Sequence, residues 1–349
     1  MKVVLLAGLA ILAAISAGVF FNQIKRGPTP VPAEIISKYT AWKKEYGKLY
    51  ATPAENDYRL RIFVVSLLRI EDYNREYEYR LEQRGGQRLT GKMFSQNMFM
   101  DIDDLEFDIK YNGDTGEIEG EERETVVDGQ VGEVRAVREW SGLGQKEEYE
   151  VRVRNQAACG SCWSFAAIAN VEKAYFDLKG QRLDFSQQEL VDCERLSNGC
   201  SGGQASRAMN YTLLNGISLA SDYPYKAIEG VCQASEKTRY NMGSGELMLG
   251  TYKLRMDSAE QLVNRGYHIS ISVVGKGMMR YLSNSIDAFD ASLTGECDEI
   301  KGHAVNLIKS YGNNTFTMLN SWSSRWASGG MKTAPPEQVA RIVERYLER

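Results

Sequence analysis

The pattern of apolar and polar positions begins with a continuous apolar run, Val3 to Phe21, which follows the basic residue Lys2. This layout is typical of a secretory signal, and the run is also close in length to a membrane span. Residues 1–21 are therefore expected to be a cleaved signal peptide or an uncleaved signal anchor. Either form directs the rest of the chain into the secretory pathway, where cysteines can pair.

The next segment is charged and repeats with the period of a helix. From Ala33 to about Arg84, residues recur at intervals of three and four, which places them on one face of a long helix. We expect Phe63 and Ile70 to be buried. The face consists of Glu55, Arg59, Phe63, Ser66, Ile70 and Asn74.

The composition changes between Asn112 and Glu133, where glycines punctuate a strongly acidic stretch. Few apolar side chains are present to offset the entropy of ordering, so this stretch is expected to be an exposed, protease-accessible linker. The chain then consists of a helical unit, residues 33–110, an acidic linker, residues 111–134, and a larger C-terminal domain, residues 135–349.

The larger domain changes from helical to strand-like along its length. An apolar run from Cys162 to Leu178 is flanked by Ser161, a residue type that favours N-caps, and by Gly180, a helix terminator. Because the run is apolar on more than one face, the helix is expected to lie at the centre of its domain. Strands follow, so the fold class is α+β. The predicted strands are His268–Val274, Ala304–Tyr311 and Thr315–Leu319.

Composition and charge narrow the classes of partner. With 349 residues, 43% of them hydrophobic and 25% charged, the chain has the composition of a soluble globular protein with more than one unit. Its net charge of −4 is small for this length and does not indicate the excess of basic residues that is typical of nucleic-acid-binding proteins. No nucleic-acid partner is expected, and a membrane contact only if the leader stays uncleaved.

Cys162 is the candidate nucleophile. At the start of a helix it faces unpaired backbone N–H groups and the positive end of the helix dipole, which both stabilise a thiolate. The chain contains two histidines, His268 and His303, either of which would strengthen this effect as an imidazolium. Asn320 lies at the end of the strand that follows His303, where it is able to orient the ring. This spacing favours His303.

The segment from Asn155 to Trp163 reads Asn-Gln-Ala-Ala-Cys-Gly-Ser-Cys-Trp, and His303 follows Cys162 by about 140 residues. It resembles the active-site signature of the papain-like cysteine proteases, in particular the cathepsin L group. The resemblance implies the papain-like two-lobe fold, with a helical left lobe and a β-barrel-like right lobe. Further matching stretches are Cys200-Ser201-Gly202-Gly203, Asp222-Tyr223-Pro224-Tyr225 and Asn320-Ser321-Trp322.

The resemblance also implies a role for each site residue. Cys162 would be the nucleophile, His303 its acid and base, and Asn320 the group that orients the imidazole. Gln156 would help to form the oxyanion hole. A cysteine endopeptidase of this kind hydrolyses proteins and peptides and needs no cofactor or metal. The remaining implied contacts are Gly202 and Gly203 against the substrate backbone and Trp322 over the histidine.

The N-terminal helical unit resembles the inhibitory pro-segment of the same group. The helical face from Glu55 to Asn74 matches its first motif, with Ser66 in place of an expected asparagine. Asn97, Phe99 and Asp101 match its second motif. The resemblance implies a precursor whose own pro-segment lies in the cleft in the reverse direction and inhibits it. A lysosome-like or vacuole-like compartment, or the extracellular space, is the implied location.

The resemblance further implies two disulfides and one unpaired cysteine. The pairs would be Cys159–Cys200 and Cys193–Cys232, which leaves Cys297 alone beside the reactive Cys162. After Trp326 the chain departs from the group, and it is expected to lack the final strand and the last disulfide. This departure motivates a rival hypothesis, a catalytically impaired homologue that acts as a binding or inhibitory protein.

The cysteine spacing is also compatible with two different functions. Cys159 and Cys162 have the Cys-x-x-Cys spacing of a thiol–disulfide oxidoreductase, although the tryptophan follows the pair instead of preceding it. A zinc site would use these two with Cys193 and Cys200, at a spacing too wide for a zinc knuckle. Separately, Asn210 and Asn313 lie in acceptor tripeptides for N-glycosylation.

Overall fold

The computed structural model describes the chain in ranges separated by gaps, and it divides into two compact units, residues 1–64 and 65–349. The leader, most of the acidic linker, Cys297, Asn313 and the C-terminal tail lie outside the described residues. Within the described part, no helix combines the length and the apolarity needed to cross a bilayer. The described ranges are 31–85, 91–114, 149–241, 256–274, 278–283, 302–312, 315–327 and 331–334.

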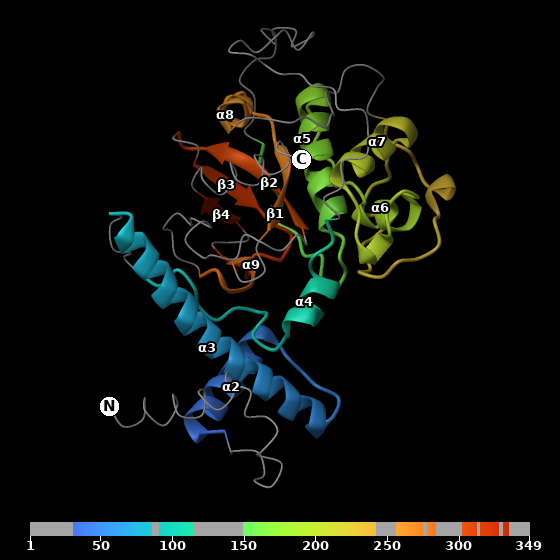
Figure 1. Cartoon of the computed structure of the whole chain (residues 1–349). Coiled ribbons are helices and arrows are strands. Elements are labelled where there is room, and N and C mark those ends of the chain that lie inside the picture. Colours follow the sequence, from blue (N-terminus) through green and yellow to red (C-terminus); the bar gives the residue numbers. More distant parts are fainter. Residues whose placement is uncertain are drawn as a thin grey trace. The chain divides into compact units, whose positions relative to one another are not determined.

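The first unit contains helix α2, Ala33–Tyr46, and the beginning of helix α3, Pro53–Gln83 (Figure 1). Gly47 ends α2 in the left-handed conformation, with φ of +64°. The ring of Phe63 packs on Tyr39 and Trp42, with centroids 5.3 and 5.2 Å apart. These three buried rings form the core of this unit.

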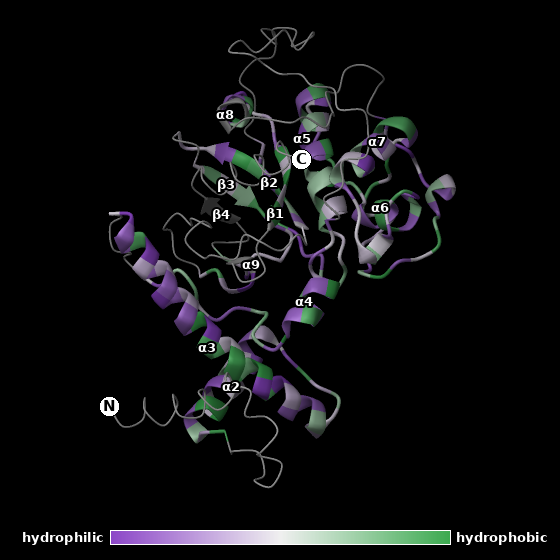
Figure 2. Ribbon diagram, viewed as in Figure 1, coloured by the Kyte–Doolittle hydropathy of each residue, from purple (hydrophilic) through white to green (hydrophobic). Residues whose placement is uncertain are grey.

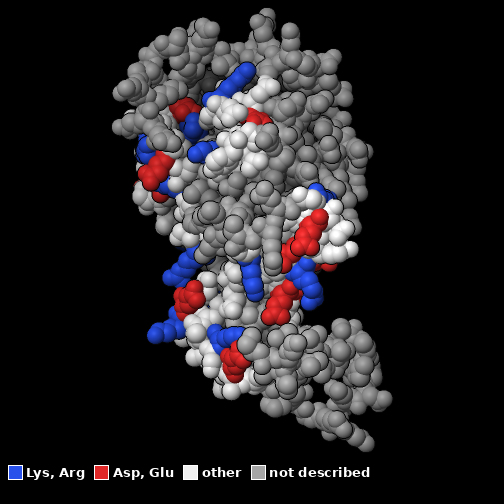
Figure 3. Space-filling model, turned by 90° about the vertical axis from the view of Figure 1, so that its left-hand side faces the viewer, with Lys and Arg blue, Asp and Glu red and all other residues white. Residues whose placement is uncertain are grey.

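Helix α3 confirms the helical periodicity predicted for the charged segment. Ser66, Ile70 and Asn74 are buried on one face. Figure 2 shows hydrophilic residues along much of the helix, whereas apolar residues predominate in the strands. Ion pairs four residues apart follow the exposed side, such as Arg80 with Glu76 at 2.7 Å. On the face drawn in Figure 3, basic and acidic side chains alternate among the described residues.

The second unit continues through α4, Asp104–Lys110, to a helical lobe. Asp103 caps α4 by accepting a hydrogen bond from the backbone N–H of Glu106 at 2.8 Å. The elements of the lobe pack around the apolar side of α5, where Trp163, Ile168 and Val171 are fully buried. They are α5, Cys162–Lys179, α6, Gln187–Cys193, η2, Gly199–Ser201, α7, Ala205–Asn215, and η3, Ala234–Glu236.

Helix α5 begins and ends as predicted, and Gly180 adopts φ of +67° after its last turn. One detail of the prediction is wrong, because Ser161 occupies the N-cap position without a side-chain capping bond. Its hydroxyl lies 2.6 Å from the hydroxyl of Tyr225 instead. A tertiary partner has therefore replaced the local cap.

The β part of the second unit is an antiparallel sheet in the order β1-β2-β3-β4. Its first three strands agree with the predicted ones. The register pairs Val273 with His303 and Asn306 with Leu319. The elements are α8, Met256–Asn264, β1, Ile269–Val274, α9, Met278–Tyr281, β2, Gly302–Ser310, β3, Phe316–Leu319, and β4, Met331–Ala334.

Strand β4 corrects the expectation that the chain lacks a final strand. It pairs with β3 from Phe316 opposite Ala334 to Leu319 opposite Met331. Backbone groups along the edge of β3 accept any extended partner. The strand therefore forms although the chain departs from the group after Trp326.

The structure contains the disulfides Cys159–Cys200 and Cys193–Cys232, the pairs that the resemblance implies. Among the described cysteines, Cys162 has a free thiol. The thiol–disulfide oxidoreductase hypothesis fails, because Cys159 is bonded to Cys200 and not to Cys162. The zinc hypothesis fails as well, because three of its four proposed ligands are consumed in disulfides.

Removing the second disulfide is expected to lower stability without touching the cleft. Cys193 and Cys232 are 39 residues apart, and closing a loop of this size restricts the unfolded chain by about 2–4 kcal/mol. The double variant Cys193→Ala/Cys232→Ala should lose about that much free energy of unfolding in urea. An unchanged unfolding midpoint would contradict this prediction.

Candidate active site

The N-terminus of α5 places Cys162 beside strand β2. Cys162 is fully buried and packs with Ala166, one turn further along α5, and with Ala304 of β2. The small side chains of the two alanines let the helix approach the strand closely. Because Ala304 directly follows His303, this contact brings the thiol and the imidazole into the same part of the fold.

His303 is oriented by residues that directly follow β3. Its Nε2 lies 2.7 Å from Oδ1 of Asn320, and the ring stacks on Trp322 at 4.2 Å between centroids. Asn320 also accepts the backbone N–H of Ser321 at 2.7 Å, which fixes its amide. The remaining ring nitrogen, Nδ1, is buried. The Tyr111 backbone lies near the ring but forms no hydrogen bond with Nδ1.

Hydrogen bonds fix both the backbone and the side chain of Gln156, in the segment before α5. Its backbone N–H donates to the carbonyl of Ser321 at 2.8 Å, and its Oε1 accepts from the Ser321 hydroxyl at 2.6 Å. The hydroxyl of Tyr225 donates to its carbonyl at 2.8 Å. The amide nitrogen donates to the carbonyls of Cys159 and Tyr111, at 2.8 and 3.1 Å. The Gln156 side chain is therefore a preorganised donor.

Two residues of this region adopt the left-handed backbone conformation that normally favours glycine. They are Ala157, with φ of +50°, and Ser323, with φ of +66°. They lie on two segments joined by the bridge between Asn155 and Trp322. Nothing in the sequence singled out Ala157.

Residues 111–114 pack between Gly203 and strand β2, which corrects the assignment of these four residues to an exposed linker. The backbone N–H of Gly203 donates to the carbonyl of Gly113 at 2.8 Å, and that of Asp114 donates to the carbonyl of Gly302 at 2.9 Å. Asp114 thus bridges Gly203 in parallel and Gly302 in antiparallel fashion. These bonds use backbone atoms alone, so the acidic and glycine-rich composition did not reveal them. Gly202, the other predicted cleft glycine, precedes Gly203 with φ of +127°.

Gly113 makes the tightest crossing of the cleft. A Cβ atom on Gly113 would overlap the backbone of Gly160, two residues before Cys162. Gly203 is similarly restricted, since a Cβ there would lie 2.7 Å from the indole of Trp163. The backbones of Gly113 and Gly160 therefore pass each other at positions where neither residue carries a side chain.

An aromatic cluster covers Trp322 on the side of residues 99–111. The rings of Phe99 and Phe107 lie 5.1 and 5.5 Å from Trp322, and Tyr111 lies 4.9 Å from Phe99. Phe99, Phe107 and Trp322 are fully buried. The cluster seals the histidine from solvent on this side.

Polar contacts attach the same segment to α9. Asn97 donates to the carbonyl of Arg280 and accepts the N–H of Phe99 at 3.0 Å. The carboxylate of Asp104 binds both Arg280 and Arg69, each at 2.5 Å. Arg280 is almost fully buried, so this carboxylate neutralises a desolvated cation.

Comparison with known proteins agrees with this arrangement. The model of the papain family of cysteine proteases matches residues 141–338, and that of the cathepsin propeptide inhibitor domain matches residues 39–107. Caricain from Carica papaya is 30% identical over 301 residues, 84% of this chain and 79% of caricain. The chain belongs to the papain family of cysteine proteases.

Solved structures show the same fold. A recombinant stem bromelain precursor has a TM-score of 0.63 at 24% identity, covering 89% of this chain and 96% of that one. A digestive procathepsin L 3 of Tenebrio molitor larval midgut also has a TM-score of 0.63, at 20% identity, covering 89% and 97%. The papain-like fold class expected from the sequence is confirmed.

The electrostatics of the site differ from the sequence expectation. Burial, and after it the negative charge of Asp114, raises the pKa of Cys162 to about 12, against the lowering effect of nearby backbone N–H groups. Burial lowers the pKa of His303 to about 4, against the raising effects of its bond with Asn320 and of the Tyr111 backbone. Both groups are neutral near pH 7 in this form, because desolvation outweighs the helix terminus.

His268 lies outside this arrangement. It precedes β1, and its ring contacts Tyr149 at 5.8 Å between centroids. Burial, followed by the charge of Lys173, lowers the pKa of His268 to about 3. His268 is half-buried, and none of its contacts among the described residues is with Cys162, which agrees with the preference for His303.

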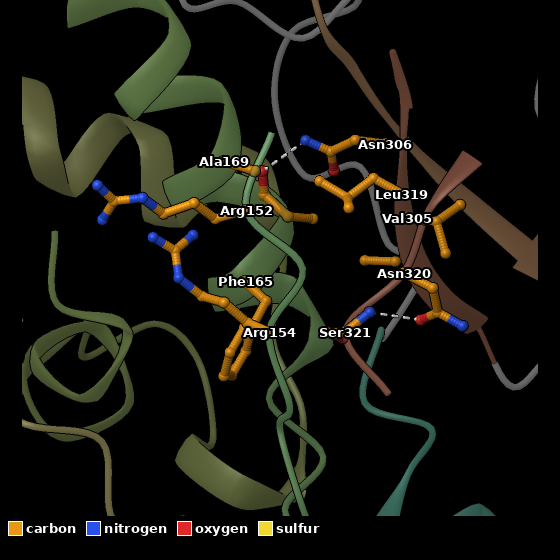
Figure 4. A pocket seen from close by; sticks show the side chains of 11 residues that line it. Arg152, Arg154, Phe165, Ala169, Val305, Asn306, Leu319, Asn320 and Ser321 are labelled. Carbon is orange, nitrogen blue, oxygen red and sulfur yellow. Dashed lines mark hydrogen bonds between the residues drawn. The ribbon is translucent and has the colours of Figure 1, made fainter. Parts of the chain in front are cut away.

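A buried polar clamp that the sequence analysis missed holds α5 against the sheet of this papain-family domain. The amide of Asn306 on β2 donates to the carbonyl of Ala166 at 3.0 Å and to Oδ1 of Asn170 at 2.7 Å. Figure 4 shows Asn306 reaching from the strand toward the helix. Asn170 also donates to Ser270 of β1 at 2.9 Å. A cavity of about 20 Å³, room for one water, lies beside this contact.

Breaking this clamp is expected to reduce both stability and peptidase turnover. Asn306→Leu keeps the side-chain volume but removes the donor, which leaves buried oxygens unpaired at a cost of about 1–3 kcal/mol. The clamp sets the position of α5 against β2, the strand that carries His303. We therefore expect a severalfold fall in kcat and a smaller factor of increase in KM. The matched control is Asn264→Leu at the exposed end of α8, which should change neither.

Proposed function

We propose that this chain is the precursor of a cysteine endopeptidase that hydrolyses peptide bonds through Cys162 and His303 and is inhibited by its own pro-segment. The observation that supports this most directly is the peptide backbone of residues 111–114, bound between Gly203 and Gly302 over Cys162. A cleft that binds one extended peptide through backbone atoms is suited to others.

In the reaction, the Cys162 thiolate attacks the carbonyl carbon of the scissile bond. The Gln156 amide, which donates to the Tyr111 carbonyl in the precursor, and the Cys162 backbone N–H stabilise the oxyanion. His303 gives its proton to the leaving amine, and a thioester remains on Cys162. Water, deprotonated by His303, then releases the acid and restores the thiol.

Asn320 and Trp322 support this cycle through the imidazole. The bond from Nε2 to Asn320 leaves Nδ1 as the nitrogen for proton transfer. The indole of Trp322 covers that bond and excludes water from it. The ring therefore keeps one orientation in its neutral and charged states.

The pro-segment inhibits in two ways in this proposal. Residues 111–114 fill the backbone positions that a substrate requires, and the Tyr111 carbonyl takes the Gln156 donor. The same residues desolvate Cys162 and His303, which opposes the charged pair. Inhibition then combines occupation of the substrate-binding positions with suppression of the Cys162 thiolate.

Activation requires cleavage beyond Asp114, in the remaining acidic linker. The processed enzyme would work in the secretory pathway, in a lysosome-like or vacuole-like compartment or outside the cell. The disulfides Cys159–Cys200 and Cys193–Cys232 support an oxidising location. Strand β4 removes the main reason for proposing an impaired homologue.

The catalytic assignment is tested by substituting the two histidines in the same way. His303→Gln, like Cys162→Ser, should lower kcat/KM on peptide substrates at least about 10³-fold after acid processing. His268→Gln should stay within about twofold of wild type per folded molecule. Full activity in either of the first two variants would refute the proposal.

Protection of the Cys162 thiol by residues 111–114 is tested by the pH dependence of thiol alkylation in the full-length precursor. With a thiol pKa of about 12, only the rare thiolate reacts, so the alkylation rate should rise about tenfold per pH unit from pH 7 to pH 10. The valine side chain in Gly113→Val would overlap the Gly160 backbone and displace residues 111–114. The thiol should then react at least about tenfold faster at pH 7.

Gly91→Val provides the matched control in the same segment. A Cβ on Gly91 meets no atom within 4 Å, so this variant should alkylate at the wild-type rate. A Gly113→Val precursor that reacts as slowly as wild type would show that residues 111–114 do not protect the thiol.

A further inference from the structure

One tyrosine hydroxyl joins the two ends of the loop that precedes the candidate nucleophile. This loop, residues 156–161, begins with Gln156 and ends with Ser161, whose carbonyl group shares a peptide bond with the N–H of Cys162. The hydroxyl of Tyr225 lies 2.8 Å from the Gln156 carbonyl and 2.6 Å from the Ser161 hydroxyl. The loop therefore carries both proposed oxyanion donors, and a residue distant in the chain ties its ends together.

The two hydrogen bonds of Tyr225 form a chain with one direction. A phenol has a single proton to donate, and Tyr225 donates it to the Gln156 carbonyl. The Ser161 hydroxyl therefore donates to Tyr225, since its other acceptor, the Cys159 carbonyl, is further away at 3.5 Å. Burial raises the pKa of Tyr225 to about 12, so the phenol keeps the proton that it donates.

The peptide group between Gln156 and Ala157 is held from both sides. Its carbonyl accepts the bond from Tyr225, and its N–H donates to Oδ1 of Asn155 at 2.9 Å. This orientation gives Ala157 a φ of +50°, which is unfavourable for a residue with a Cβ atom. Rotating the peptide group by half a turn would return φ to a negative value and break both bonds. The Tyr225 hydroxyl therefore opposes a rearrangement that Ala157 by itself favours.

Both proposed oxyanion donors depend on the orientation of this loop. The Gln156 amide donates to the carbonyl of Cys159 at 2.8 Å, so a rearranged loop would displace the acceptor that aims the amide. Ser161 is fully buried and directly precedes Cys162. Its side chain makes no capping bond to α5 and is held by Tyr225 instead.

From this geometry we propose that Tyr225 is a positioning residue for the oxyanion hole. Its hydroxyl holds Gln156 and Ser161 in the orientation in which the Gln156 amide and the N–H after Ser161 stabilise the same oxygen. The proposal rests on the peptidase function proposed above and adds a residue that acts through Gln156.

The test compares two tyrosines of one segment in the full chain after acid processing, with active sites counted by an irreversible thiol electrophile. Tyr225→Phe removes the hydroxyl and keeps the ring, which packs edge-on against Phe165 at 4.9 Å between centroids. Its kcat/KM on peptide substrates should fall about tenfold, a part of the roughly 10²–10³-fold that one oxyanion donor contributes. Tyr223→Phe removes a hydroxyl bound to Asp192 at 2.8 Å and should stay within about twofold of wild type.

Thiol alkylation separates the oxyanion hole from the Cys162–His303 pair. Alkylation of Cys162 by iodoacetamide forms no tetrahedral oxyanion, so processed Tyr225→Phe should react within about twofold of the wild-type rate. A loss of the same size in alkylation and in peptide hydrolysis would mean that Tyr225 acts on the thiolate, which would overturn the proposal.

Two double variants test whether Tyr225 acts through Gln156 and the strained peptide group. Once Gln156→Ala has removed the amide, adding Tyr225→Phe should cost about threefold or less. Ala157→Gly removes the strain of the positive φ, so Tyr225→Phe/Ala157→Gly should regain at least about threefold in kcat/KM over Tyr225→Phe. An undiminished effect of Tyr225→Phe in the Gln156→Ala background, or no gain with glycine, would overturn the assignment.

Asn155→Ala tests the same peptide group from its other side, at an exposed position where the fold tolerates substitution. It removes the acceptor of the Ala157 N–H and should lower kcat/KM about threefold, with recovery when Ala157→Gly is added. This variant decides the question if Tyr225→Phe yields no folded enzyme. An unchanged kcat/KM in Asn155→Ala would then contradict the role of the peptide group.

The outcomes also separate this inference from the proposed function. If wild-type Cys162 is not labelled and no peptide is hydrolysed, the peptidase function itself fails. If the wild-type enzyme is active and Tyr225→Phe behaves like Tyr223→Phe, only the positioning role of Tyr225 is overturned.

Discussion

The close contact between the start of α5 and strand β2 is the constraint on which the rest of the site depends. Cys162 and His303 lie on different elements, and they come into the same part of the fold because Ala166 and Ala304 let the backbones approach. Packing alone would allow the helix to slide. The buried hydrogen bonds from Asn306 to the helix are directional, so they fix the position of α5 along the strand.

Burial serves two opposite purposes in this molecule. Around Asn320 and Trp322 it protects a hydrogen bond that orients the imidazole. Over Cys162 it removes the water that would stabilise a thiolate, and Asp114 adds a charge of the wrong sign. In the proposed function, the same two residues form an active pair or an inactive one, depending on whether residues 111–114 exclude solvent from them.

Strained and tightly packed backbone is concentrated around the same cleft. Ala157 and Ser323 hold left-handed conformations on the two segments that carry Gln156 and Trp322. Gly113 and Gly203 have no room for a side chain. Such positions persist because the surrounding hydrogen bonds over-determine them, and they set the width of the space in which a peptide lies.

The sequence by itself determined the helical character of the charged segment, the central helix from Cys162 and the first three strands. Through a family signature it also singled out Cys162, His303, Asn320 and Gln156 as candidate site residues. Periodicity and local motifs are carried by neighbouring residues, so they can be read without a fold. Strand β4, the lost cap of Ser161, the clamp of Asn306 and the course of residues 111–114 were decided only by the tertiary structure. Each of these depends on a partner distant in the chain, frequently on backbone atoms that all residues share, and no local pattern specifies such a partner.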